Sequence, residues 1–471
     1  MISTLRLFVC GLALMAPSLP ALADDLPPIE IPRTPGLPYT VRNIPDRVVL
    51  TPGADPATEM AVSFRTDSMQ RTAEAQLAIA VDGPTLEKHA STVTGTSTVL
   101  PSSNGLAHYH HVRFTGLKPD TVYAYRVKGQ AGFTEWHQFK TAATEARPFR
   151  FMYLGDTQNG ILDFASRVIR RGFHEGKVEL VVHAGDLIAQ RDDLDHDDEW
   201  GEWTQAGGYS YAMVPQLPAT GNHEYADRIL PDGSESRKLG QHWQAQFALP
   251  ANGAAGLTAT TYYVDYQGVR FIVLDGTAAL DLGQLDVQTK WLDDTLAASK
   301  ATWNFVLFHQ PIFTCARPND TEALKAAWKP IFDKRKVDLV LQGHDHCYSR
   351  LSSEAGRAAG ITARKSGKTQ GPVYLVSVAG SKMYGLNDRA GTQPDKVAEA
   401  TELYQIVDVE TGRLKFRTYT ASGKLYDGFD LQRQKNGSNR MVELTEPMLA
   451  TRTCKDGKGP DGDKCVAKAK D

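Results

Sequence analysis

Five apolar segments in the middle of the chain each end in a short polar tip, and this recurring pattern constrains the fold most strongly. Amphipathic stretches with helical periodicity at 160–175, 284–299 and 321–334 lie among these segments. Continuous apolar strands separated by helices are typical of a sheet that is covered on both faces. In such sheets, ligands gather at the carboxyl ends of the strands. The segments are 149–154, 180–183, 270–274, 304–308 and 337–341.

Polar tips in this region carry side chains that can bind metal ions. Oxygen and imidazole ligands together suit borderline divalent metals such as zinc, manganese and iron. One carboxylate shared between two ions can hold them ~3.5–4 Å apart, as in two-metal hydrolases. A single Gly-Asp is usually a turn or a helix cap, but here every candidate lies at a strand end of one domain. The candidates are Asp156, Asp186, Asn222 with His223, His309, and His344 with His346.

The chain before this region has the pattern of an all-β domain. Short apolar–polar alternations recur between turn signals from Asp46 to Thr141, a spacing typical of a β-sandwich of about 100 residues. The segment from Leu117 to Tyr123 resembles the tyrosine corner of fibronectin type III-like domains. The predicted divisions are a signal peptide at 1–23, an extended lead-in at 24–45, a sandwich at 46–146, a catalytic domain at 147–431 and a polar tail at 432–471.

The first 23 residues match a secretory signal. Arg6 is the positive region, residues 7–15 are apolar, and Ala21-Leu22-Ala23 fits a cleavage site. A buried N-terminal helix is the alternative. We expect export to the periplasm or the extracellular space without a membrane anchor, because no later apolar run could span a bilayer. A formal net charge of -3 gives no electrostatic reason to expect nucleic acid as a partner.

The order of the motifs resembles the calcineurin-like metallophosphoesterases, and within them the purple acid phosphatases. The motifs GD, GD, GNHE, FHQP and GHDHCYSR carry this resemblance, which covers roughly residues 40 to 430. It implies an α/β fold, a four-layer αββα sandwich preceded by an all-β fibronectin-like sandwich. It also implies a metal-dependent phosphoric ester hydrolase similar to acid phosphatases, with two metal ions in each chain.

The resemblance assigns a role to each candidate ligand. Two metals would share one carboxylate, that of Asp186. The first metal would be held by Asp156, Asp186 and His346, and the second by Asp186, Asn222, His309 and His344. His223 would contact the phosphate and help to protonate the leaving oxygen, since an imidazole titrates near neutral pH. Alternatively, His223 only supports its neighbour Asn222.

Two departures from purple acid phosphatases concern the first metal. The family places a metal-binding Tyr three residues after its second Asp, where this chain has Ala189. The Asp-x-His pattern of other superfamily members is also missing, because position 158 is Gln. Gln158 or water would complete this site. We therefore favour an all-divalent pair of Fe, Mn or Zn over a pair that contains ferric iron.

Additional substrate contacts are predicted at Arg317 and Tyr348. Plant purple acid phosphatases have histidines soon after the motif equivalent to FHQP, where this chain has Cys315 to Asn319, so the substrate contacts differ. Arg317 can clamp a phosphate, although a surface arginine is the default interpretation. Tyr348 belongs to the last motif and is a candidate ligand or substrate contact.

The cysteines favour disulfides, because an even number would remain after removal of the signal. If His309 and His346 approach one metal pair, as the resemblance implies, the loops that follow them leave neighbouring strand ends. The first two cysteines, one in each loop, could then bond, and the last two would pair by elimination. Separate buried thiols are the alternative for the first two. The four residues are Cys315, Cys347, Cys454 and Cys465.

We expect hydrolysis of a small phosphate ester, in particular a monoester, by direct attack of metal-bound hydroxide. A phosphodiesterase or nucleotidase with the same metals is the alternative enzyme. A β-sandwich binding or adhesion protein with a vestigial metal domain is the alternative of another class, and the intact set of candidate ligands argues against it. The sequence does not set the oligomeric state.

Overall fold

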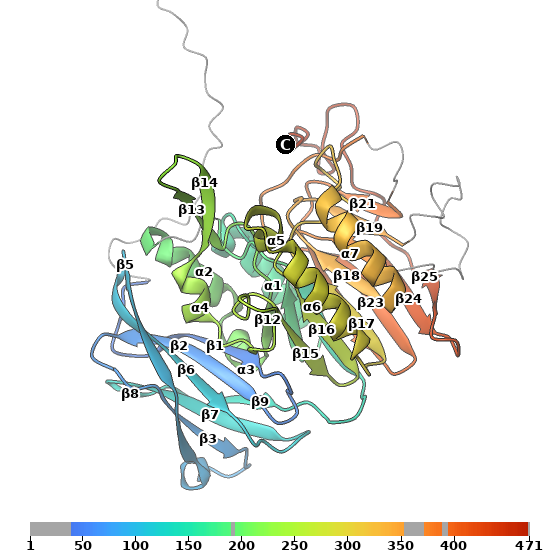
Figure 1. The fold of residues 1–471 in the computed structure, drawn as a ribbon. Helices are drawn as coiled ribbons and strands as arrows, with labels where there is room; N and C mark the ends of the chain where they lie inside the picture. The colour runs from blue at the N-terminus through green and yellow to red at the C-terminus, as the bar shows by residue number, and fades with distance from the viewer. Residues whose placement is uncertain (1–38, 190–193, 353–371, 389–393, 470–471) are drawn as a thin grey trace, which may run out of the picture.

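A β-sandwich forms the first part of the computed structural model, which describes residues 39–189, 194–352, 372–388 and 394–469 (Figure 1). Its strands are β1 (Asp46–Pro52), β2 (Met60–Asp67), β3 (Glu74–Ile79), β4 (Ser91–Thr94), β5 (Thr96–Ser102), β6 (Gly105–Phe114), β7 (Val122–Gly129), β8 (Gly132–Phe133) and β9 (His137–Lys140). One sheet has the order β1-β2-β6-β5, and the other contains the remaining strands. The Tyr123 hydroxyl accepts the backbone N–H of Lys118 at 2.8 Å, as the predicted tyrosine corner requires.

The expected signal peptide at 1–23 and most of the extended lead-in lie outside the described residues. Within the part of the chain that the structure describes, no helix is both long enough and apolar enough to cross a bilayer.

Two seven-stranded sheets follow the sandwich. The first has the order β12 (Gln216–Pro218), β11 (Leu180–His183), β10 (Phe149–Leu154), β22 (Leu403–Val409), β23 (Arg413–Thr420), β24 (Leu425–Arg433) and β25 (Asn439–Glu443). The second has the order β15 (Tyr262–Tyr266), β16 (Val269–Val273), β17 (Trp303–Leu307), β18 (Leu339–Gln342), β20 (Val373–Val376), β19 (Tyr348–Leu351) and β21 (Lys396–Ala398). Strands β10 to β12 are parallel, as are β16, β17, β18 and β20.

The two sheets pack against each other through one apolar core. The Phe151 ring of β10 lies 5.4 Å from the Phe271 ring and 5.9 Å from the Phe305 ring, both on the second sheet. Helices α1 (Ser166–His174) and α2 (Asp197–Gly207) cover the first sheet, while α5 (Gly276–Asp281), α6 (Leu285–Ala297) and α7 (Glu322–Arg335) cover the second (Figure 1). This is the predicted four-layer αββα architecture. It explains the continuous apolar strands, because each is covered on both faces.

The remaining short elements lie within the sandwich or in the loops that connect the strands and helices of the four layers. They are the single-turn helices at Leu86–His89 and Leu194–His196, a π-helix at Ile161–Ala165, α3 (Tyr209–Met213), α4 (Gln241–Gln246), and the hairpin of β13 (Tyr225–Ile229) and β14 (Glu235–Leu239). The π-helix directly precedes α1 and follows the loop at the end of β10. Single π-turns often occur at functional sites.

The end of the chain differs from the predicted polar tail at 432–471. Strand β24 continues to Arg433, and β25 pairs with it in the antiparallel direction. Only Met441 of β25 is buried, so its apolar alternation is too weak to predict a strand from sequence.

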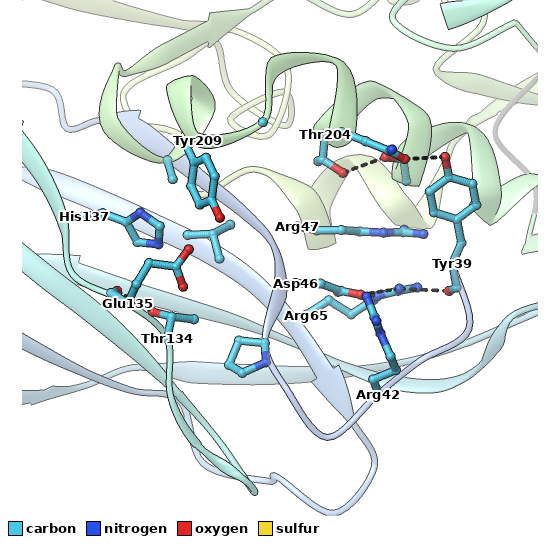
Figure 2. A pocket seen from close by; sticks show the side chains of 16 residues that line it. Tyr39, Arg42, Asp46, Arg47, Arg65, Thr134, Glu135, His137, Thr204 and Tyr209 are labelled. Atoms are coloured by element: carbon cyan, nitrogen blue, oxygen red, sulfur yellow. Dashed lines mark hydrogen bonds and ion pairs between the residues drawn. The ribbon is translucent and has the colours of Figure 1, made fainter. Parts of the chain in front are cut away.

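A buried ionic network joins the sandwich to the helices of the first sheet. The Asp197 carboxylate at the start of α2 lies 2.7 Å from Arg47 of β1 and 3.1 Å from Arg65 of β2. His242 of α4 lies 2.9 Å from the same carboxylate. Burial opposes ionisation of Asp197, but the charge of Arg47 and the hydrogen bonds hold its pKa well below the usual value. A cavity of about 650 Å³ lies beside this network, between the sandwich and helices α2 and α3 (Figure 2).

Replacement of Asp197 by alanine should destabilise the protein by about 3–5 kcal/mol, because two buried arginines lose their shared carboxylate. Urea denaturation measures this loss as a change in the free energy of unfolding. Asp294→Ala is the control, since its carboxylate forms an exposed pair with Lys290 and should contribute little. Equal stability of the two variants would show that the network does not hold the domains together.

Candidate metal centre

Loops from both sheets meet at the carboxyl ends of the parallel strands. The first sheet contributes Asp156 after β10, Asp186 after β11 and Asn222 after β12, and the second contributes His309 after β17 and His344 and His346 after β18. Asn222 lies between Gly221 and His223, and the His223 N–H donates to the Asp186 carboxylate at 3.0 Å. The structure thus brings all six predicted ligands to one edge, where the two sheets face each other.

Two groups of three side chains can each hold a metal ion, and they share Asp186. One ligand atom from each of Asp186, His309 and His344 lies within 4.8 Å of the other two, and the same is true of Asp156, Asp186 and His346. The His309 Nε2 is 3.1 Å from Asp186 Oδ2, and the His346 Nε2 is 3.9 Å from Asp156 Oδ1. The His344 Nδ1 lies 3.1 Å from His309 Nε2. A carboxylate that belongs to two neighbouring ligand groups has the position of a bridging ligand.

Backbone carbonyls orient two of the imidazoles. The His309 Nδ1 lies 2.7 Å from the Ala184 carbonyl oxygen, and the His346 Nδ1 lies 3.1 Å from that of Lys382. A carbonyl can only accept, so each Nδ1 carries a proton and each Nε2 is the nitrogen that faces the centre and could bind a metal. Metal-binding histidines are usually held in this way.

Four of the candidate ligands have a left-handed backbone conformation that side chains other than glycine rarely adopt. The φ angles are 29° at Asp156, 50° at Asp186, 73° at His344 and 48° at His346. The His344 N–H donates to both Asp156 carboxylate oxygens, at 2.9 and 2.7 Å, which helps to hold this conformation. A Cβ at Gly343 would lie only 2.3 Å from the same carboxylate, so the approach requires glycine. Strain of this kind concentrates at functional sites.

The pKa shifts of the side chains in the centre are consistent with a site that binds cations. Burial raises the pKa of Asp156, while the charge of His309 lowers the pKa of Asp186 against the effect of burial. In turn, Asp186 and Asp156 raise the pKa of His309 to about 9 although burial opposes this. Burial lowers the pKa of His344 and of His346, which leaves both imidazoles neutral and able to bind metal. Two buried carboxylates beside neutral imidazoles form a donor set for divalent metals.

Gln158 lies at this centre. Its Nε2 is 2.8 Å from Asp186 Oδ2 and 3.1 Å from His346 Nε2, and its buried Oε1 has no hydrogen-bond partner. A buried amide oxygen without a donor is rare. In this orientation the amide nitrogen faces Asp186 and His346, and a flipped amide would present the oxygen to a cation in that ligand group.

His223 lies at the rim of the centre. Its side chain is 16% exposed, and its Nε2 is 3.9 Å from Asp186 Oδ2. It is therefore close to the shared carboxylate while remaining accessible from outside.

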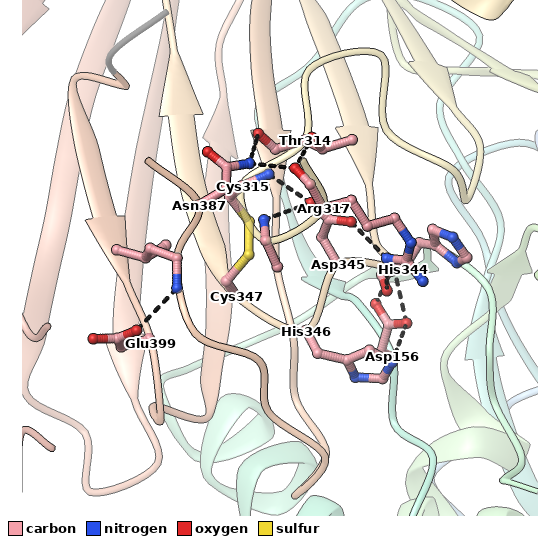
Figure 3. Close-up of a disulfide and its surroundings, with 12 residues drawn as sticks. Asp156, Thr314, Cys315, Arg317, His344, Asp345, His346, Cys347, Asn387 and Glu399 are labelled. Atoms are coloured by element: carbon pink, nitrogen blue, oxygen red, sulfur yellow. Dashed lines mark hydrogen bonds and ion pairs between the residues drawn. A yellow bond between two sulfur atoms is a disulfide. The ribbon is translucent and has the colours of Figure 1, made fainter. Parts of the chain in front are cut away.

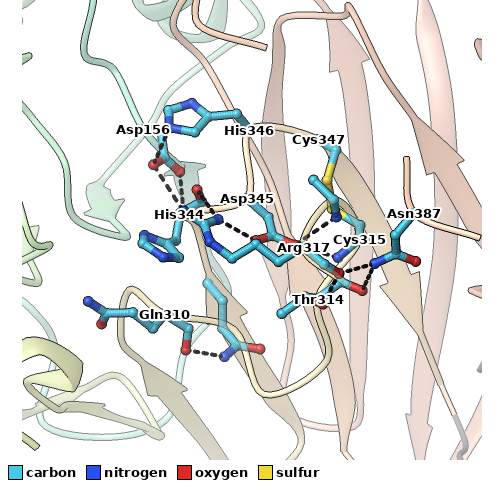
Figure 4. Close-up of polar contacts among 12 residues, drawn as sticks. Asp156, Gln310, Thr314, Cys315, Arg317, His344, Asp345, His346, Cys347 and Asn387 are labelled. Atoms are coloured by element: carbon cyan, nitrogen blue, oxygen red, sulfur yellow. Dashed lines mark hydrogen bonds and ion pairs between the residues drawn. A yellow bond between two sulfur atoms is a disulfide. The ribbon is translucent and has the colours of Figure 1, made fainter. Parts of the chain in front are cut away.

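The prediction of a ligand or substrate contact is wrong for Tyr348, and for Arg317 it stays a prediction. The Arg317 guanidinium donates to Asp345 at 2.6 Å and to the His344 carbonyl at 3.1 Å, so it braces a ligand-bearing loop (Figure 4). Tyr348 is fully buried in β19, where its hydroxyl donates to Asp427 at 2.8 Å. Although Tyr348 belongs to the last motif, its side chain lies in the apolar core and not at the metal centre.

Both predicted disulfides are present, Cys315–Cys347 and Cys454–Cys465. The first links the loop after His309 to the loop that carries His344 and His346 (Figure 3). The buried Asp345 carboxylate adds to this link, because it accepts the backbone N–H groups of Cys315 and Ala316. The two ligand-bearing loops are thus fastened together covalently and by hydrogen bonds.

Glu224 is a residue of the centre that the sequence did not reveal. Its fully buried carboxylate accepts the N–H groups of Asp186 at 3.0 Å, Leu187 at 2.7 Å and Gly221 at 2.6 Å. It therefore joins the loop of the shared carboxylate to the loop of Asn222. Glu224 is the last residue of the GNHE motif, but the sequence-based interpretation of that motif gave roles only to Asn222 and His223.

The segment from Gly380 to Tyr384 was also not predicted to be part of the site. The Gly380 N–H donates to the Asp156 carbonyl at 2.7 Å, and the Tyr384 N–H donates to the His346 carbonyl at 3.1 Å. This segment follows β20 and contains no Asp, Asn or His, the residue types that marked the other loops of the centre, so it was not recognised from the sequence.

Comparisons with known proteins agree with this geometry. Residues 149–348 match the family model of the calcineurin-like phosphoesterases, and residues 45–141 match that of the purple acid phosphatase N-terminal domain. An uncharacterized protein of Mycobacterium tuberculosis is 27% identical over 73% of this chain and 70% of its own length. The Fe(3+)-Zn(2+) purple acid phosphatase 12 of Arabidopsis thaliana is 24% identical over 79% of each chain.

A solved structure of PhoD has a similar fold. Its TM-score is 0.60 at 14% identity, with 93% of this chain and 96% of that chain covered. The two family models together match more than half of the sequence, in the order in which the sandwich and the paired sheets occur. The chain therefore contains a calcineurin-like phosphoesterase domain preceded by the N-terminal domain of the purple acid phosphatases, and it is a hydrolase of phosphoric esters.

Proposed function

We propose that this enzyme is an exported phosphatase that hydrolyses phosphate monoesters at a centre of two divalent metal ions. The observation that carries the proposal is the pair of ligand groups that share Asp186. One ion alone would leave one of these two groups of buried donors without a cation. A dinuclear centre accounts for both groups.

The residues that would hold the ions come from both sheets. The first ion would be held by Asp156, Asp186, His346 and Gln158, and the second by Asp186, Asn222, His309 and His344. When bound, two such ions activate water as a nucleophile and offset the charge that develops on the phosphoryl oxygens.

His223 is the proposed proton donor to the leaving oxygen. Its Nε2 lies 3.9 Å from Asp186 Oδ2, so a protonated imidazole there would be next to a negative charge. Its exposed fraction of 16% leaves room for contact with a substrate. An imidazole in this position can donate a proton to an alkoxide as it leaves.

Two further features support export and a pair of divalent ions. Disulfides such as Cys315–Cys347 persist in oxidising compartments outside the cytoplasm. Ala189, at the position of the family's metal-binding Tyr, offers no side-chain oxygen that would favour ferric iron.

A phosphodiesterase or nucleotidase could use the same centre. Hydrolysis rates for a panel of monoesters, diesters and nucleotides, measured with Mn, Zn or Fe, test the proposal. Faster hydrolysis of diesters than of monoesters under every metal would overturn monoester preference.

Asp186→Asn should remove both ions, because the amide weakens two ligand groups at once. Activity should fall more than about 100-fold, beyond the loss typical of residues that only support a ligand. Elemental analysis and an assay with 4-nitrophenyl phosphate measure the two effects. Asp286→Asn on α6, whose side chain is exposed, is the matched control and should keep both ions. A folded Asp186→Asn protein with two ions and full activity would exclude a shared carboxylate.

Protein loaded with iron alone should lack the intense visible band of a tyrosinate bound to ferric iron, because position 189 is alanine. Visible absorption spectroscopy checks this. Ala189→Tyr provides the contrast, since its phenol would enter the first ligand group and should create the band. A strong band in the unmodified protein would mean that another tyrosine binds the metal.

A further inference from the structure

Lys382 lies on a segment that is fixed beside the candidate metal centre. Its backbone carbonyl accepts the His346 Nδ1–H at 3.1 Å. The Ser381 hydroxyl donates to the Asn159 carbonyl at 2.7 Å, and the Gly380 N–H donates to the Asp156 carbonyl at the same distance. The backbone around Lys382 is therefore held by the loops of two candidate ligands, on the side of the first ligand group.

The side chain of Lys382 places its charge close to the same group. Its Nζ is 5.7 Å from the centre of the Tyr384 ring, and this ring lies edge-on to the His346 ring at 5.2 Å. Burial lowers the pKa of His346, and the positive charge of Lys382 lowers it further. The same charge opposes the burial that raises the pKa of Asp156. The ammonium group thus lies beside the Tyr384 ring, which itself packs against the candidate ligand His346.

No ion pair joins Lys382 to a carboxylate among the described residues, although its side chain is half-buried. Arg317 provides the comparison. Its guanidinium lies 6.0 Å from the same Tyr384 ring, but it is paired with the buried Asp345 carboxylate at 2.6 Å. Of these two cations beside Tyr384, the arginine is neutralised by a carboxylate within the described residues, and the lysine ammonium can still pair with an anionic ligand.

We infer that the Lys382 ammonium binds a non-bridging phosphoryl oxygen of the substrate and selects phosphate monoesters over diesters. This inference rests on the proposed function. A monoester phosphate carries about -1.5 to -2 charges near neutral pH. A diester has lost one ionisable oxygen and carries a single charge. An additional cation beside the centre therefore favours the monoester, because a charge-assisted contact strengthens with the charge of its acceptor.

Three substitutions separate this role from a structural one. Lys382→Gln removes the charge at similar length, Lys382→Ala removes the side chain, and Lys382→Arg restores a cation. Lys468→Gln is the control, because that lysine lies in the segment that packs beside Gly385 and is paired with the exposed Asp388. Calorimetry of inorganic phosphate binding to the Mn-loaded protein gives a readout that does not depend on turnover.

Lys382→Gln and Lys382→Ala should weaken phosphate binding about ten-fold, the loss expected for one charge-assisted hydrogen bond. The KM for 4-nitrophenyl phosphate should rise by a similar factor, while the KM for bis(4-nitrophenyl) phosphate should change little. Lys382→Arg should recover most of the phosphate affinity, and the metal content of all variants should equal that of the unmodified protein.

Three results would overturn the inference. They are unchanged phosphate binding in Lys382→Gln, equal loss for both substrates, and loss of metal from the variants, which would make Lys382 structural. The absence of any phosphoesterase activity in the metal-loaded unmodified protein would instead refute the proposed function.

Discussion

The Asp186 carboxylate is the group on which the rest of the centre depends, because it belongs to both ligand groups. It is fully buried beside Asp156, and two carboxylates this close repel each other unless cations lie between them. Without metal, His309 supplies part of that charge, at 3.1 Å from Asp186. Bound ions would take over this role and leave the imidazole as a neutral ligand. Because the two sheets face each other, the Asp186 carboxylate can belong to ligand groups that contain side chains from both sheets.

Holding this arrangement requires support from outside the ligands. Four ligand residues have strained backbones, and each strained loop is fixed by a second group. Glu224 joins the loops of Asp186 and Asn222 through three backbone N–H groups. The Asp345 carboxylate and the Cys315–Cys347 disulfide join the loops of the second sheet. Preorganisation of this kind keeps the ligand positions defined before metal or substrate arrives.

The sequence predicted the features that follow from local pattern. Apolar strands with polar ends predicted the sheets and the convergence of Asp156, Asp186 and His309, because parallel strands bring their carboxyl ends to one edge. Sequence analysis missed residues whose role depends on contacts with residues far away in the chain. The Glu224 carboxylate contacts backbone N–H groups of other loops, and Lys382 is brought to the centre by the contacts of its segment, and neither arrangement leaves a periodic signal. Tyr348 shows the opposite error, since motif membership suggested a role at the centre while its strand directs it into the core. Strand β25 was missed because it buries only Met441.

Anomalous diffraction from crystals grown with Mn²⁺ tests the central claim most directly, since it locates each ion without reference to activity. The account predicts two peaks about 3.5–4 Å apart, one on each side of the Asp186 carboxylate. One peak should lie next to Asp156 and His346, and the other next to His309 and His344. A single peak under saturating metal, or two peaks of which only one contacts Asp186, would contradict a centre built on a shared carboxylate.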